Sequence, residues 1–301
     1  MWVSAAFLSA LMLGLYDVAK KRSLSGNAVV AVLWFNTLIS SILFLPVVVD
    51  SEFSLGLLAN SALCYEPTTS LFSHFLVAIK AVITLSSWIC GYYAMKHLPL
   101  TIVGPVNATR PVVVLIGAVL LFGERLNMWQ WSGVLLTIAS LYLLSLSSKK
   151  ENVSFSSRHA VAMFMAMLLG AVSGLFDKYI ISEHSLAPMF VQSWFSIYQL
   201  AIMTLLLFII WYPRRKVDKF HWTWAIPLIS IFVSLADFCY YHAIDMDGSM
   251  IAVISMIRRF SVVVSFLCAA CLFGEKNIKS KALDMVLILV GMILLAIGSI
   301  R

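Results

Sequence analysis

Ten apolar segments, each about long enough to cross a bilayer, follow one another along the chain. A hydrocarbon core of roughly 30 Å requires about 20 apolar residues of helix. The segments are predicted at about 2–19, 28–49, 72–95, 100–122, 129–148, 159–180, 188–211, 223–246, 249–273 and 281–300. Because only short loops are left between them, the sequence predicts an all-α polytopic membrane protein with no soluble domain for a catalytic site.

The composition agrees, since 61% of the 301 residues are hydrophobic and only 12% are charged. The net charge of +7 would suit a nucleic-acid partner. However, the basic residues lie in short clusters beside the apolar segments, as positive-inside anchoring requires. We therefore expect no nucleic-acid partner and a multi-pass location in the plasma membrane, which is the inner membrane in a bacterium.

Short elements recur in the two halves of the chain in the same order. Gly14-Leu-Tyr-Asp17 matches Gly174-Leu-Phe-Asp177 at an offset of 160 residues. Three more elements match: Trp34-Phe35 with Trp194-Phe195, Tyr92-Tyr93-Ala94 with Tyr241-His242-Ala243, and Phe122-Gly-Glu124 with Phe273-Gly-Glu275. The sequence therefore predicts two five-helix repeats, residues 1–150 and 151–301. Because five is odd, the second repeat enters the bilayer from the opposite side, as in the inverted repeats of many secondary transporters.

Arginines lie within two matching apolar segments, the fourth and the ninth. Arg110 precedes Pro-Val-Val-Val, and Arg258-Arg259 precede Phe-Ser-Val-Val-Val. A charged group inside a membrane is costly and faces protein or a water-filled cavity rather than lipid. Guanidinium groups bind carboxylate or phosphate bidentately and stay charged. We therefore predict that Arg110 and one of Arg258 and Arg259 hold an anionic group of a cargo near the middle of the membrane.

The sequence leaves open which arginine of the ninth segment faces the site. Counted back from the glutamate that ends each copy, Arg258 mirrors Arg110, because positions that differ by three lie on nearly one helix face. The alignment through Tyr92 and Tyr241 pairs Arg259 with Arg110 instead.

Lys80 and Asp237 are the other ionisable residues predicted well inside the segments. A positive surplus remains even if Asp237 pairs with Lys80 or with an arginine, and such a structural ion pair is the alternative role for each of these groups. Asp237 is also the candidate carboxylate for a proton if transport is proton-coupled. A permanent pair with an arginine would keep it charged and defeat that role.

Asn107, Tyr92 and Tyr241 are the uncharged polar residues predicted to bind the cargo beside these charges. Interhelical hydrogen bonding explains Asn107 without a cargo, and packing explains the tyrosines. The five cysteines are an odd number and four lie in apolar segments, so they predict neither disulfides nor a metal site. We expect no catalytic, metal-binding or cofactor-binding residues.

Small residues lie four apart in the first and sixth segments, Ala10 with Gly14 and Gly170 with Gly174. This spacing is typical of helices that approach closely. Asp17 and Asp177 follow them near the segment ends, where we expect capping or interfacial ion pairs.

Two five-span repeats, each with a Phe-Gly-Glu element followed by a basic residue (Arg125 or Lys276), resemble the drug/metabolite transporter superfamily, most closely its EamA-type members. The resemblance covers essentially the whole chain. It implies an all-helical secondary carrier, not an enzyme, that moves small metabolites or drugs without ATP hydrolysis or a bound cofactor. The pair Arg258-Arg259 is also similar to a basic pair in the organophosphate and nucleotide-sugar branch, where such residues receive substrate phosphate.

Two arguments about orientation disagree. Of the 21 basic residues, 14 lie in or beside loops of one parity, three lie on the other side and four lie within spans. The positive-inside rule then places both termini outside the cytoplasm. The family resemblance implies that both termini are inside.

The sequence thus predicts a secondary transporter of small anionic metabolites, phosphorylated or carboxylated, that works by alternating access at a midplane cavity. An exporter of amino acids or amphipathic drugs is the alternative within transport. A lipid flippase or a non-transporting membrane scaffold is the alternative from another class. The expected partners are the small-molecule cargo and the lipid bilayer. Transport direction, the coupling ion and whether the carrier forms a homo-oligomer stay open.

Overall fold

The computed structural model describes residues 2–53, 70–99, 109–122, 158–246 and 260–272 without a gap, and scattered residues between these ranges. Within this part the chain is helical and contains no strand, which confirms the all-α class. The α-helices are α1 (Trp2–Leu24), α2 (Val29–Glu52), α3 (Leu71–His97), α5 (Arg110–Phe122), α7 (Arg158–Lys178), α8 (Pro188–Leu206), α9 (Ala225–Asp245) and α11 (Ser261–Leu272). Short π-helical and 3-10 turns follow two of them: η1 (Tyr179–Glu183), η2 (Leu207–Trp211) and η3 (Tyr212–Arg214).

Six helical stretches are long and apolar enough to cross a membrane. They are Trp2–Leu24, Val29–Glu52, Leu71–His97, Arg158–Ile181, Pro188–Arg214 and Ala225–Asp245. An α-helix satisfies its own backbone hydrogen bonds, which lipid cannot do. These stretches confirm six of the ten predicted segments and a multi-pass membrane protein. The segments predicted at 100–122, 129–148, 249–273 and 281–300 lie partly outside the described residues, and α5 and α11 are the helices within two of them.

Helix α1 extends five residues beyond its predicted end at residue 19, so Lys20 and Lys21 belong to the helix rather than to a loop. The Lys21 ammonium donates to the backbone oxygens of Met95 and Leu98, at 2.8 and 2.5 Å, at the end of α3. Such contacts satisfy carbonyls that have no partner within their own helix. The chain then turns at Gly26, whose φ of +67° favours glycine.

The fourth and ninth predicted segments are each interrupted by a turn. The Thr109 amide donates to the Val106 oxygen at 3.3 Å, and the Phe260 amide donates to the Ile257 oxygen at 2.9 Å. Both bonds span three residues rather than the four of an α-helix. Pro111 contributes by removing a backbone donor at the start of α5. Non-helical backbone inside a membrane is tolerated where it is buried or lines a cavity, and both turns lie beside an arginine.

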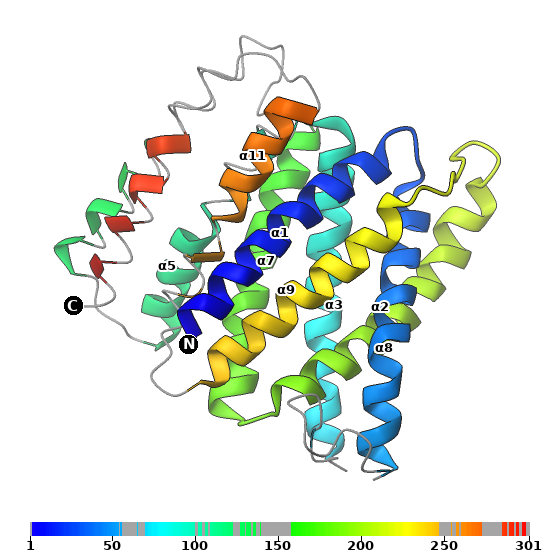
Figure 1. Cartoon of the computed structure of the whole chain (residues 1–301), viewed down its shortest axis with the longest axis horizontal. Coiled ribbons are helices and arrows are strands. Elements are labelled where there is room, and N and C mark those ends of the chain that lie inside the picture. The colour runs from blue at the N-terminus through cyan, green and yellow to red at the C-terminus, as the bar shows by residue number, and fades with distance from the viewer. Residues whose placement is uncertain are drawn as a thin grey trace.

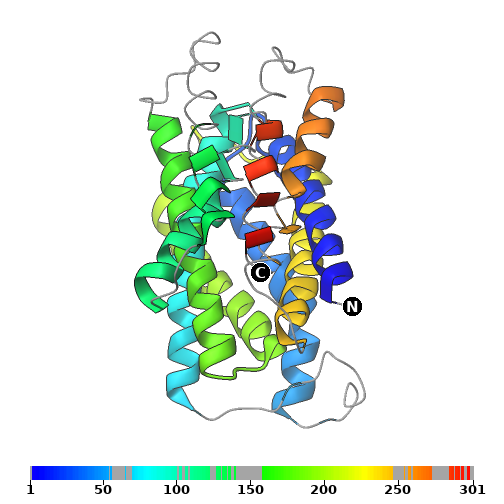
Figure 2. The same ribbon diagram turned by 90° about the vertical axis from the view of Figure 1, so that its left-hand side faces the viewer.

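The helices pack in reciprocal pairs around a common centre. Helix α1 packs against α9 and α11, while α7 packs against α3 and α5, and α2 lies against α8. The long contact between α1 and α9 is visible in Figure 1, and Figure 2 shows that α1 and α7 run in opposite directions through the bundle. The core cluster around Tyr92 and Met95 joins α1, α2, α3, α7 and α9.

Hydrogen bonds from small polar side chains reinforce these contacts. The Ser9 hydroxyl donates to the Ala236 oxygen at 2.6 Å, Ser41 to Ser196 at 2.8 Å and Ser87 to Ala166 at 2.7 Å. Each bond joins a helix before residue 150 to one after it, so buried polar groups as well as apolar packing connect the two parts of the chain.

Close approach of helices is confirmed at Gly14. A Cβ atom there would lie 2.5 Å from Cβ of Val264 and 3.0 Å from the Ser261 oxygen, both on α11. At Gly174 nothing lies within 4 Å of such an atom. The expected close approach is therefore absent at that position.

Candidate functional site

A cavity of about 180 Å³ lies between α1, α3, α5, α7 and α9. Its wall includes seven charged residues: Asp17, Lys20, Lys80, Arg110, Asp177, Asp237 and Arg258. The predicted site residues Asn107, Tyr92 and Tyr241 also line it. The fold thus brings together all the predicted site residues except Arg259, which lies outside the described part of the chain. Their role in binding stays a prediction.

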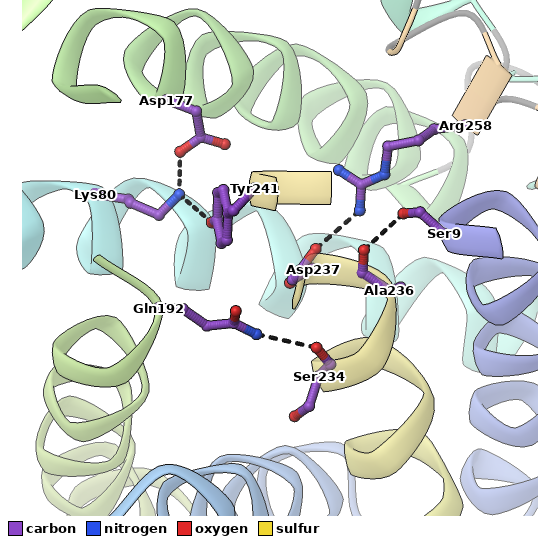
Figure 3. A network of polar contacts seen from close by, with 9 residues as sticks. All are labelled: Ser9, Lys80, Asp177, Gln192, Ser234, Ala236, Asp237, Tyr241 and Arg258. Carbon is purple, nitrogen blue, oxygen red and sulfur yellow. Dashed lines mark hydrogen bonds and ion pairs between the residues drawn. The ribbon is translucent and has the colours of Figure 1, made fainter. Parts of the chain in front are cut away.

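Lys80 of α3 forms a buried ion pair with Asp177 of α7, and it donates a second hydrogen bond to the Tyr241 hydroxyl at 2.6 Å (Figure 3). The rings of Phe195 and Tyr241 each have their centroid 4.9 Å from the ammonium. The ammonium is therefore held by one carboxylate, one hydroxyl and two aromatic faces. The prediction that Asp177 caps a helix or forms an interfacial pair was wrong, because the side chain points into the bundle and the residue is only 6% exposed.

Arg258 forms the second ion pair of the cavity. Its Nη2 lies 2.8 Å from Oδ1 of Asp237, and its Cζ lies 3.9 Å from the centroid of the Tyr240 ring. Figure 3 shows the guanidinium pointing toward Asp237, which α9 presents from the opposite side. Of the two arginines that the sequence left open, Arg258 lines the cavity. Asp237 is the structural ion-pair partner of Arg258, rather than of Lys80 or Arg110.

Arg110 differs from the other three cations of the cavity. Its Nη2 donates to Oδ1 of Asn107 at 3.5 Å, and no carboxylate of the described residues pairs with it. Its buried Nε has no hydrogen-bond partner, which is also true of Nε of Arg258. The guanidinium rests on Gly170 of α7, where a Cβ atom would lie 2.4 Å from Cζ. Gly170 therefore makes room for a charged side chain rather than for another helix backbone.

Asp17 and Lys20 form a third pair that the sequence reasoning missed as part of the site. The two groups are 2.9 Å apart within α1, and the Lys20 ammonium lies 4.2 Å from the Tyr16 ring centroid and 5.2 Å from that of Tyr92. The hydroxyls of Tyr16 and Tyr92 are 3.4 Å apart. A signal was available in the sequence, because an acid and a base three residues apart lie on one helix face.

The described residues contain no group of three or more His, Cys, Asp or Glu side chains that could hold a metal ion. Within the same part of the chain, Cys90, Cys239 and Cys268 are free thiols. Cys64 and the side chain of Cys271 lie outside it. The cavity therefore offers charged and hydrogen-bonding side chains, which suit recognition of a small polar molecule.

Comparisons with known proteins agree with this architecture. Residues 1–146 match the profile of the EamA-like transporter family. The chain also superposes on a solved structure titled only "Crystal structure of protein", with a TM-score of 0.66 and 15% sequence identity. The superposition covers 100% of this chain and 98% of the other. At this identity the similarity shows the fold alone. No protein with a curated description is similar to the chain. By its first half, residues 1–146, the chain belongs to the EamA-like transporter family and hence to the drug/metabolite transporter superfamily.

Proposed function

We propose that the protein is a secondary carrier of a small anionic metabolite, phosphorylated or carboxylated, that works by alternating access. The observation that carries this proposal is the state of Arg110. It is the one cation of the described cavity wall without a carboxylate partner. A buried guanidinium without a carboxylate partner is stabilised by an anion that accepts hydrogen bonds from its N–H groups.

The packing of the helices supports an inverted repeat, which is a common architecture of carriers that work by alternating access. Suppose that a two-fold axis exchanges α1 with α7, α3 with α9 and α5 with α11. The same axis then turns the α1–α9 contact into the α7–α3 contact. It also turns α1–α11 into α7–α5, and it exchanges α2 with α8 where they meet each other. All of these contacts are present, so the observed pairing is what two related halves, residues 1–150 and 151–301, would produce.

The size and charge of the cavity favour an anionic metabolite over the alternatives. Sites for drug-sized ligands are roughly 300–1,000 Å³, larger than the 180 Å³ cavity. An amino acid would need a carboxylate for its ammonium group, but Asp17, Asp177 and Asp237 all pair with cations of the protein. The cavity therefore carries one uncompensated positive charge in the described wall, which a monoanion would neutralise.

A thermal-shift screen of purified protein in detergent tests this proposal. A ligand that binds the folded state raises the melting temperature by mass action. Phosphorylated and carboxylated metabolites should stabilise the protein, whereas zwitterionic and cationic ones should not. In Arg110→Gln the stabilising anion should bind at least about tenfold more weakly, because charge-assisted hydrogen bonds contribute about 1.5–3 kcal/mol each.

Arg110→Lys should recover only part of the affinity, since an ammonium keeps the charge but not the planar fork. Stabilisation by cationic or zwitterionic compounds alone would overturn the proposal. It would favour the alternative function, an exporter of amino acids or amphipathic drugs. Stabilisation by phospholipid headgroups in place of soluble anions would favour a lipid flippase.

A further inference from the structure

The ion pair of Lys80 with Asp177 connects the two parts of the chain at the cavity wall. Lys80 lies on α3 and Asp177 lies on α7, 97 residues apart in the sequence, and their side chains are only 2% and 9% exposed. Tyr241 of α9 accepts a hydrogen bond from the same ammonium. A change in this pair therefore acts directly on the contact between α3 and α7.

The other two acid–base pairs of the cavity differ from it in ways that matter for proton binding. Asp237 is paired with Arg258, and a guanidinium does not give up its proton in proteins, so this pair cannot become neutral when the carboxylate binds a proton. Asp17 is paired with Lys20 three residues along the same helix, and its contact with another helix is a hydrogen bond of 3.5 Å that it accepts from Ser265 of α11. A proton on Asp17 would therefore release no ion pair between helices. Of these three pairs, only Lys80–Asp177 joins two different helices without an arginine as the basic partner.

We propose that Asp177 is the proton-coupling carboxylate of the carrier, with Lys80 as its partner. This inference rests on the proposed carrier function. One proton from water on one side of the membrane adds to a carboxylate oxygen of Asp177, and the pair changes from neutral to a net charge of +1 while Lys80 stays an ammonium. Release of that proton to the other side restores the carboxylate, so no other bond is made or broken.

Protonation of Asp177 has a direct structural consequence. The Lys80 ammonium would keep only the Tyr241 hydroxyl and two ring faces as partners, and a buried charge without its counter-charge is strongly destabilised. The protonated protein therefore favours an arrangement in which Lys80 turns toward water or a cargo anion in the cavity, and the ion pair that joins α3 to α7 is then lost. In this way proton binding and the rearrangement of the halves are coupled.

Other charged groups face Asp177 at longer range. Asp237 of α9 and Arg258 act on it through their charges, and Arg110 of α5 lies against the same helix at Gly170. The side chain of Lys178, next to Asp177 in α7, lies outside the described residues. Since Asp237 and Arg258 neutralise each other, Lys80 is the charge that governs Asp177.

The test measures charge movement after a pH jump in proteoliposomes adsorbed on a solid-supported membrane, with no cargo present. Proton binding to a buried site should give a transient current in the parent protein and none in empty liposomes. Asp177→Asn should abolish the transient, and Asp177→Glu should keep it. Asp237→Asn with Arg258→Met, which removes both charges of the other deep ion pair of the cavity, should keep it as well.

Because Asp177→Asn leaves Lys80 unpaired and this variant can misfold, the same recording is made on Asp177→Asn with Lys80→Gln, which removes both charges. A transient that persists in Asp177→Asn with Lys80→Gln, that is absent from the parent, or that disappears in Asp237→Asn with Arg258→Met instead would overturn the proposal. A parent that shows the transient but no anion-dependent stabilisation would overturn the proposed cargo and leave the proton site standing.

Discussion

The two halves of the chain each place an arginine beside the same cavity but surround it differently. Arg258 is held by the Asp237 carboxylate at 2.8 Å and by the Tyr240 ring at 3.9 Å. In the alignment of Tyr92 with Tyr241, an offset of 149 residues, the positions equivalent to 237 and 240 are 88 and 91, although the same offset places Arg259 rather than Arg258 opposite Arg110. Trp88 and Gly91 occupy these positions, so the first half of the chain supplies neither the carboxylate nor the tyrosine ring there.

This difference suggests different roles for the two arginines. In the second half of the chain, the Asp237 carboxylate neutralises Arg258. In the first half, no carboxylate of the described residues pairs with Arg110, which under the proposed function is the group that the cargo anion neutralises. Because a cation that the protein already neutralises has little charge left for a ligand, we expect the selectivity for anions to come mainly from Arg110.

The largest effect is expected from removing the built-in counter-charge. Asp237→Asn leaves Arg258, 8% exposed, without its carboxylate, and breaking such a buried pair costs about 3–5 kcal/mol. The melting temperature in detergent should fall markedly. The double change Asp237→Asn with Arg258→Met should melt closer to the parent, since an apolar side chain needs no counter-charge. Equal melting of Asp237→Asn and the parent would show that Arg258 is solvated without Asp237.

The next effect comes from giving the first half of the chain a carboxylate at the position that is aligned with Asp237. Trp88→Asp should provide Arg110 with an internal carboxylate and weaken binding of the stabilising anion by about tenfold or more, the equivalent of one charge-assisted bond. Trp88→Asn is the matched control, because it removes the indole without adding charge. If titration calorimetry finds the same affinity in both variants, Trp88 is not the equivalent of Asp237.

A smaller effect is expected at Gly170, on which the Arg110 guanidinium rests. Gly170→Ala puts a methyl group 2.4 Å from Cζ, so the guanidinium must shift, at a cost of about 1–3 kcal/mol for overpacking. Anion affinity should fall. Gly174→Ala, one turn along α7, meets nothing within 4 Å and should fall less. Equal losses in the two variants would mean that Gly170 matters only as a helix residue.

The smallest effect is expected for an ion pair outside the cavity. Lys96 lies 3.6 Å from Asp218, with side chains 25% and 44% exposed. Pairs in water are screened and contribute at most about 1 kcal/mol, often nothing measurable. Lys96→Gln should therefore leave the melting temperature nearly unchanged at physiological salt. A fall in melting temperature as large as that of Asp237→Asn would show that burial does not determine how much an ion pair contributes to the stability of this protein.

Most of the helices could be predicted from the sequence because the bilayer sets their length and composition. Six predicted segments correspond to observed membrane-length helices, and seven of the eight predicted site residues line one cavity. A cation in an apolar segment is so costly that its presence alone marks a polar interior. The orientation, the inverted repeat and the site roles stay predictions.

The rest of the site depends on contacts between distant segments. Lys20 and Asp177 were placed outside the membrane core because hydropathy penalises each charge singly, whereas paired charges cost much less. The choice between Arg258 and Arg259 could not be made because counting residues on a helix face assumes a continuous helix. The turn at Phe260 interrupts it.

A structure of the protein with its stabilising anion bound would show which cation of the cavity receives the cargo. We expect anion oxygens about 2.7–2.9 Å from the guanidinium nitrogens of Arg110, with Asp237 still paired to Arg258. An anion bound to Arg258 or Lys20, with Arg110 unoccupied, would rule out Arg110 as the anion-binding residue.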